Sequence, residues 1–213
     1  MKYLSMLLLT LITFGCSKEK KKLPEEFDYG KAKDGLYKNS YFDLTIQYNP
    51  NWVLQSQEQV DELVDQGSEL AAGDNENLKN VIKASKVTTA YLLTLFKHEV
   101  GAAVESNPSF MAIAENTKSS PGIKTGEDYL FHTKKLLAQS QIQYSFEKDV
   151  YEKTIGDRTF HVLEGKIQMA NGGTMTQEYI VTVMNGFSLT FVATYTNEDE
   201  KGELYKIIDS IKI

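Results

Sequence analysis

The sequence predicts an α+β fold, in which a mainly antiparallel sheet carries helices packed on it. The first observation is the C-terminal third, where strand-like segments cover residues 143–155, 160–169, 174–184 and 187–194. They are joined at Gly156-Asp157, Asn171-Gly172-Gly173 and Asn185-Gly186, and such turns readily place φ above zero and favour tight hairpins. The second observation is that helical patterns lie in the middle and at the end of the chain, rather than between successive strands. An antiparallel meander with separate helices is therefore expected.

The helices are indicated by the residues that precede them. Four side chains suit helix N-caps at the head of apolar, periodic segments: Ser56, Asp74, Thr125 and Asn197. Ser56 and Thr125 are each followed three residues later by the Gln or Asp that completes a capping box, and Gly73 is expected to end the first helix. In the last helix, an i, i+3, i+4, i+7 stripe predicts that one face lies on the sheet: Leu204, Ile207, Ile208 and Ile211.

The N-terminal half contains further extended segments. Residues 35–39, 41–48 and 52–54 combine aromatic and β-branched side chains and are expected to be short strands. The continuous apolar run within residues 88–97 predicts a central strand covered on both faces. Residues 110–115, which follow Asn107-Pro108, are expected to form the next strand.

The N-terminus has the features of an export signal. Lys2 gives it a positive start, and residues 4–14 form an apolar stretch of eleven residues, too short to span a bilayer as a helix. The stretch ends at Gly15-Cys16, which resembles the lipobox of bacterial lipoproteins. This resemblance implies that residues 1–15 are a signal peptide cleaved after Gly15 and that Cys16 is lipidated. A plain signal peptide that happens to contain Cys16 and a buried hydrophobic helix are the alternatives.

Residues 16–34 are expected to be the lipidated cysteine and a disordered tether, because they are rich in Lys and Glu and show no apolar periodicity. Residues 35–213 then form one globular domain of ordinary size. The lipid would hold this exported domain on a membrane of the cell envelope. Ser17 is not the aspartate associated with inner-membrane retention in some Gram-negative bacteria, which favours an outer membrane where there is one.

Composition and spacing argue against several chemistries. The net charge of −6 and the pI near 5.2 argue against nucleic acid as a partner, because phosphate binding needs clustered Lys and Arg. With Cys16 as the single cysteine, the chain has no intramolecular disulfide and no cysteine-based metal site. His98, His132 and His161 lack metal-ligand spacing, and no G-x-S-x-G motif is present. We therefore expect no catalytic residue, metal or cofactor from the sequence.

Several segments together carry a resemblance to a known fold family. They are YKNSYFDLTIQYNPNW at residues 37–52, Asn107-Pro108-Ser109-Phe110, GIKTGEDYL at residues 122–130, Gln177-Glu178-Tyr179, and the close from Ala193-Thr194-Tyr195 to Ser210-Ile211-Lys212-Ile213. In this order they resemble the PsbP-like α/β/α sandwich, shared by a photosystem extrinsic protein, a Ran-binding nuclear import factor and many bacterial domains. The resemblance implies a binding, assembly or accessory role without a shared catalytic residue set.

The sequence therefore predicts a membrane-anchored envelope lipoprotein that acts as a non-enzymatic binding or accessory module for an envelope protein or a small ligand. Trp52, the single tryptophan, is either buried in the core at a corner of the chain or part of an exposed recognition surface. The alternative is a hydrolase that acts on envelope polymers through carboxylates, since the chain has 29 acidic residues. Acids that converge in a deep pocket would favour the hydrolase, whereas an apolar or aromatic groove would favour the module.

Overall fold

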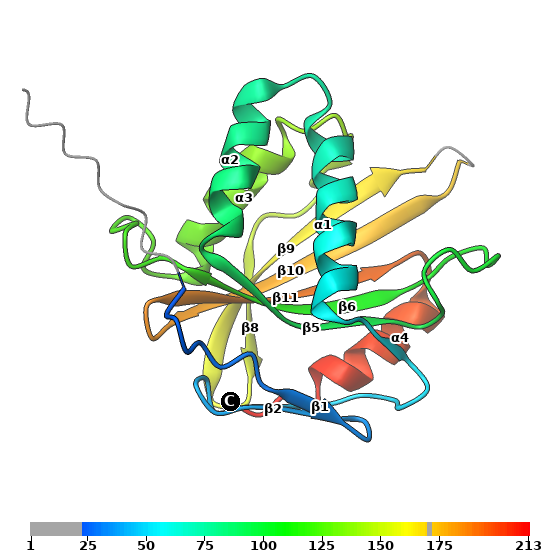
Figure 1. The fold of residues 1–213 in the computed structure, drawn as a ribbon. Coiled ribbons are helices and arrows are strands. Elements are labelled where there is room, and N and C mark those ends of the chain that lie inside the picture. Colours follow the sequence, from blue (N-terminus) through cyan, green and yellow to red (C-terminus); the bar gives the residue numbers. More distant parts are fainter. Residues whose placement is uncertain (1–22, 170–171) are drawn as a thin grey trace, which may run out of the picture.

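The computed structural model describes residues 23–169 and 172–213, which form three layers (Figure 1). The middle layer is an antiparallel sheet with the strand order β4-β5-β6-β11-β10-β9-β7, and β8 also pairs with β9. Its strands are β4 (Val53–Leu54), β5 (Thr89–Phe96), β6 (Ser109–Asn116), β7 (Tyr144–Ser145), β8 (Tyr151–Ile155), β9 (Arg158–Gln168), β10 (Thr174–Met184) and β11 (Phe187–Tyr195). The predicted α+β class is confirmed.

The C-terminal meander of β8, β9, β10 and β11 is confirmed. β10 and β11 pair from Thr176↔Tyr195 to Met184↔Phe187 across the turn at Asn185-Gly186, where both residues have positive φ. β8 and β9 are joined by a tight turn at Gly156-Asp157, in which Gly156 has φ +59°. One expected strand is wrong in extent, because residues 143–155 contain two short strands, β7 and β8, which pair with different parts of β9.

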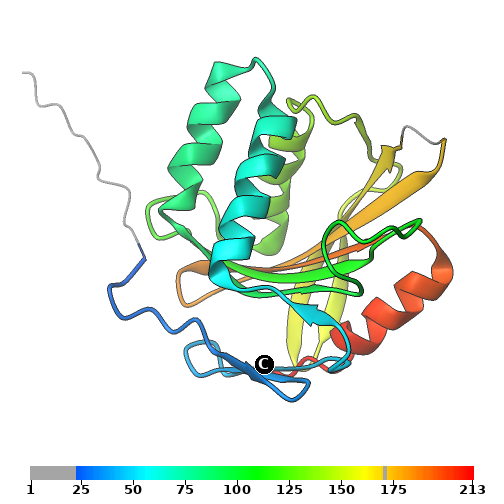
Figure 2. The same cartoon turned by 45° about the vertical axis from the view of Figure 1, so that its right-hand side comes forward.

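One face of the large sheet carries three helices, α1 (Gln57–Ala72), α2 (Glu76–Lys86) and α3 (Gly126–Leu137) (Figures 1 and 2). The capping boxes at Ser56 and Thr125 are confirmed. The N-cap of α2 is Asn75 instead of Asp74, because the Asn75 Oδ1 atom accepts the bond from the Leu78 N–H at 3.1 Å. Gly73 ends α1 as expected.

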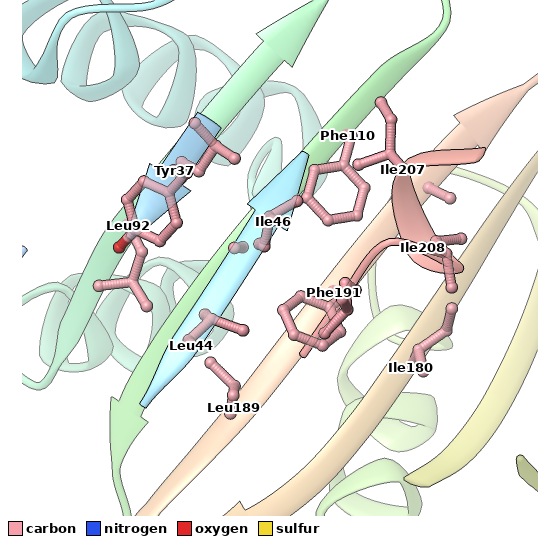
Figure 3. Close-up of a cluster of buried hydrophobic side chains, with 14 of the residues drawn as sticks. Tyr37, Leu44, Ile46, Leu92, Phe110, Ile180, Leu189, Phe191, Ile207 and Ile208 are labelled. Atoms are coloured by element: carbon pink, nitrogen blue, oxygen red, sulfur yellow. The ribbon is translucent and has the colours of Figure 1, made fainter. Parts of the chain in front are cut away.

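The other face is covered by α4 (Glu198–Ile208) and by a small antiparallel sheet of β1 (Lys31–Lys33), β2 (Leu36–Asn39) and β3 (Leu44–Gln47). The main hydrophobic core lies between this layer and the large sheet. Figure 3 shows Phe110, Phe191 and Ile180 of the large sheet beside β3 and the end of α4. The four residues predicted as a helical stripe are buried, but α4 ends at Ile208, so that Ile211 lies beyond the helix: Leu204, Ile207, Ile208 and Ile211. The PsbP-like relationship itself stays a prediction.

Two N-terminal expectations differ from the structure. Residues 41–43 form a turn ahead of β3, with Asp43 at φ +51°, so the expected strand over 41–48 is shorter. Residues 23–34 were expected to be disordered tether, but they are packed on the domain. Lys31–Lys33 pair with β2, and Phe27 is 8% exposed. Most residues of this segment are polar, but the free energy gained by burial of the Phe27 ring outweighs the solvation of its polar neighbours.

The predicted signal peptide, its cleavage position at Gly15 and the lipidated Cys16 lie outside the described residues. Within the described part of the chain, no helix is long and apolar enough to cross a membrane.

Candidate functional site: a groove beside Trp52

A groove of about 560 Å³ lies where the loop between β3 and β4 approaches α4 and the end of β5. This volume is in the range of small-molecule sites. The lining residues come from three segments far apart in the sequence: Gln47, Tyr48, Asn49, Asn51, Trp52, Lys97, His98, Glu203, Lys206, Ile207 and Ser210. The groove therefore arises only when the chain has folded.

Hydrogen bonds fix the loop that forms one wall. The Asn49 side-chain oxygen accepts from the Asn51 N–H at 3.0 Å, and the Asn49 carbonyl accepts from the Trp52 N–H at 2.9 Å. The opposite wall is joined to β3 through Ser210, whose Oγ accepts from the Gln47 N–H at 2.9 Å and lies 3.0 Å from the Gln47 carbonyl oxygen. Both walls are thus held by hydrogen bonds to backbone groups, as expected of a preformed site.

Trp52 is a core residue that also borders the groove. It is 7% exposed and belongs to the main hydrophobic cluster, so the core interpretation of this residue is correct for most of its surface. No hydrogen bond of its indole N–H is found among the described residues, and this N–H is not one of the buried polar atoms that lack a partner. It is therefore accessible, and a ligand in the groove can accept a hydrogen bond from it. A role of Trp52 in recognition stays a prediction.

Charged groups in the groove are divided into paired and unpaired ones. The Lys97 Nζ atom lies 2.9 Å from both carboxylate oxygens of Glu203, which fixes this pair across β5 and α4. Lys206 lies about one helical turn beyond Glu203 on α4 and has no ion-pair partner in the described part of the chain. Two lysines face one glutamate here, so the groove is locally positive in a chain of net charge −6.

His98 is placed at the groove by its own backbone. The His98 N–H donates to the Asn107 Oδ1 atom at 2.9 Å, and the Asn107 side chain donates back to the His98 carbonyl at 2.9 Å. No protein partner of its imidazole is found within residues 23–169 and 172–213. The imidazole adds a second donor to the groove for an anionic or hydroxyl-bearing ligand.

The structure does not bring the three histidines together. His98 lines the groove, His132 is exposed on α3, and His161 lies beneath the start of α3 with its side chain 15% exposed. Among the residues that the structure describes, no group of three His, Cys, Asp or Glu side chains could hold a metal ion. The described surface thus offers no evident metal centre, and the expected lack of a cofactor stays a prediction.

Sequence reasoning missed a pair of buried carboxylates. Glu164 on β9 and Glu178 on β10 are direct cross-strand partners, 8% and 0% exposed, on the sheet face that α4 covers. Glu178 accepts hydrogen bonds from the hydroxyls of Tyr195 at 2.6 Å and Tyr205 at 2.8 Å. Burial, followed by the Glu178 hydrogen bond and charge, raises the pKa of both tyrosines. The strand alternation offered a signal, because Glu164 follows Phe160 and Val162 on one face.

Cations also flank this pair. The Lys148 Nζ atom lies 3.0 Å from the Glu164 carboxylate, and the Lys201 Nζ atom lies 3.8 Å from that of Glu178. With α4 and its tyrosine in place, Glu178 is closed to solvent, so this pair does not form the deep open pocket that the hydrolase hypothesis requires.

Comparison with known proteins does not identify a family. No protein-family model matches the chain, and no curated protein matches it. Among solved structures, a protein of unknown function from Pseudomonas aeruginosa is 16% identical over 49% of this chain and 70% of its own, with a TM-score of 0.37. A protein from Bacteroides thetaiotaomicron VPI-5482 is 11% identical over 79% of this chain and 44% of its own, with a TM-score of 0.42. Neither similarity identifies a function.

Proposed function

We propose that this protein is a lipid-anchored envelope module that binds a small anionic ligand in the groove beside Trp52. The observation that carries the proposal is the unpaired Lys206 in a preformed groove that His98 also lines. A lysine without a carboxylate partner offers a full positive charge to a ligand, and a bond to a charged group is worth about 1.5–3 kcal/mol.

The composition of the groove also favours ligand binding over a purely structural role. The Lys97–Glu203 pair neutralises itself and fixes one wall, so Lys206 alone determines the sign of the charge that the groove attracts. Trp52 supplies an apolar surface with one indole donor, and Asn49 and Asn51 supply amide groups at the rim. A few polar groups on an aromatic floor are typical of small-molecule sites.

Ligand binding can be measured by the fluorescence of Trp52, since this is the single tryptophan of the chain. Citrate, inorganic phosphate, glucuronic acid and N-acetylmuramic acid are the probes. We expect a saturable change in emission with at least one of them and about tenfold weaker binding in Lys206→Gln, which keeps the side chain polar but removes its charge. Lys83→Gln, which removes an exposed charge on α2, is the matched control and should bind like the wild type.

Two results would count against the groove. One is the lack of any saturable change with all four anions. The other is equal affinity in Lys206→Gln and Lys83→Gln, because the charge that we assign to recognition would then have no effect.

The anchor is tested separately from the groove. We expect the protein purified from envelopes to lack residues 1–15 and to carry acyl mass on Cys16, whereas Cys16→Ser should prevent both changes. More than one acyl chain is needed for stable anchoring, so the mass also distinguishes a lipoprotein from a singly acylated protein. An unmodified Cys16 in intact-mass spectra would refute the anchor and leave the groove proposal standing.

A further inference from the structure

The described chain begins at a fixed point on the domain. The Leu23 N–H donates to the Val87 carbonyl at 3.3 Å, just before β5 begins at Thr89. Four residues later, the Phe27 ring lies 5.4 Å from that of Phe187 and is largely buried. The position at which a lipid on Cys16 would be joined to the domain is therefore determined by packing.

This packing leaves little chain between the lipid and the domain. Only Ser17 to Lys22, six residues, separate Cys16 from Leu23. Even fully extended, the distance from Cys16 to Leu23 is at most about 25 Å. The sequence alone indicated a tether three times as long, from which a domain could turn in any direction.

The groove lies at the opposite end of the domain. β5 starts beside Leu23 and ends at Phe96, and the next two residues, Lys97 and His98, line the groove. Eight residues of strand span about 25 Å. Figures 1 and 2 show the start of the described chain, in blue, and α4, in red, at opposite ends of the molecule in both views.

We define the exit end by Leu23, Val87 and Lys118, and it carries charges of both signs. The Thr117 N–H bond to the Gly186 carbonyl at 3.0 Å joins the start of the loop at 117–124, with Lys118, to this end. Asp61 and Asp65 line a pocket together with Leu23. The neighbouring residues 17–26 contain four lysines against three glutamates. The opposite end exposes four acidic side chains around the positive groove of Lys97 and Lys206: Glu99, Glu105, Glu198 and Asp199.

We propose that the exit end faces the lipid bilayer and that the groove faces away from it. The proposal rests on the anchor of the proposed function. The short connection keeps the exit end within about 25 Å of the lipid, while the groove lies at the far end of β5. The lysines beside Cys16 add an attraction to anionic headgroups of about 1 kcal/mol each close to the surface. The ligand of the groove is then an anion from the aqueous side of the membrane, and it is not a lipid headgroup.

Two exposed valines offer a matched test of this orientation. Val87 at the exit end is 46% exposed, and Val100 at the opposite end is 49% exposed. Because Cys16 is the single cysteine and is occupied by lipid, Val87→Cys and Val100→Cys each give one free thiol for a fluorophore. The lipidated variants are placed in vesicles of phosphatidylethanolamine and phosphatidylglycerol that carry a quencher on the headgroups.

We expect strong quenching of the label in Val87→Cys, and little quenching of the label in Val100→Cys or of Trp52 in the wild type. Quenching in Val100→Cys that equals or exceeds that in Val87→Cys would refute the orientation while leaving the anchor intact. If the purified protein does not associate with the vesicles at all, the anchor fails, and the orientation fails with it. Citrate should also change the Trp52 emission on vesicles as it does in solution. A citrate effect that is seen in solution and lost on vesicles would contradict a groove open to the aqueous side.

Discussion

Replacement of Phe27 by alanine is the sharpest test of the packed N-terminal segment. The ring is 8% exposed and lies 5.4–5.5 Å from the rings of Tyr29, Tyr41 and Phe187. Removal of a buried Phe side chain costs about 3–5 kcal/mol, which includes the lost aromatic contacts and the cavity left behind. The segment is close to the chain end and can move into part of that cavity. We therefore expect a loss of about 3 kcal/mol in the free energy of unfolding.

Urea unfolding followed by Trp52 fluorescence measures this loss, because the single tryptophan is buried in the same core. Tyr29→Ala is the matched control, since it removes a neighbouring aromatic ring that is 42% exposed. Its cost should stay below about 1 kcal/mol. If Phe27→Ala is within about 0.5 kcal/mol of the wild type, residues 23–34 do not contribute to the fold. The tether would then be longer, and the argument that orients the domain on the membrane would lose its basis.

Two further predictions concern buried polar groups. Glu178→Ala leaves the hydroxyls of Tyr195 and Tyr205 without their acceptor and should lower the free energy of unfolding by about 2–4 kcal/mol. Tyr205→Phe should lower it by about 1 kcal/mol. Equal melting temperatures for the two variants would contradict this assignment. Burial raises the pKa of Tyr91 to about 12, so above pH 10 the native state retains a proton that the unfolded state has lost. The contribution of Tyr91 to the free energy of unfolding is then fully present below pH 10 and is lost as the pH rises toward 12. Tyr91→Phe should reduce this loss when urea unfolding is measured at several pH values. An unchanged dependence of the free energy of unfolding on pH would show that Tyr91 titrates normally.

The features that could be predicted from the sequence are those set by residues close together in the chain. The turn at Asn185-Gly186 and the capping box of Ser56 and Gln59 each involve no more than four consecutive residues. The stripe on α4 needed only the helical period. Even here a local ambiguity remained, because Asp74 and Asn75 are both good N-caps, and the backbone path after Gly73 decides which side chain reaches the Leu78 N–H.

The candidate site could not be predicted because it depends on contacts between distant segments. Lys97 and Glu203 are 106 positions apart, and nothing near either residue indicates the other. The sequence favoured a structural or solvent-facing role for His98 over a metal ligand and did not indicate the groove, which forms only where the end of β5 meets α4. The tether was misjudged for a related reason. The partners of Phe27, among them Phe187, lie far away in the sequence, whereas composition is averaged over near neighbours.

The buried carboxylates connect the two layers that enclose the main core. Two like charges placed directly across a strand pair are unfavourable, so each carboxylate needs compensation from outside the sheet. Glu178 receives it from α4, through the Tyr205 hydroxyl and Lys201, while Glu164 receives it from Lys148 ahead of β8. The same helix supplies Glu203 and Lys206 to the groove. A shift of α4 would break the Tyr205 hydrogen bond and the Lys201 contact to Glu178, so these contacts hold one wall of the groove in place. Glu178→Ala should therefore weaken anion binding at the groove, although Glu178 is not among the residues that line it.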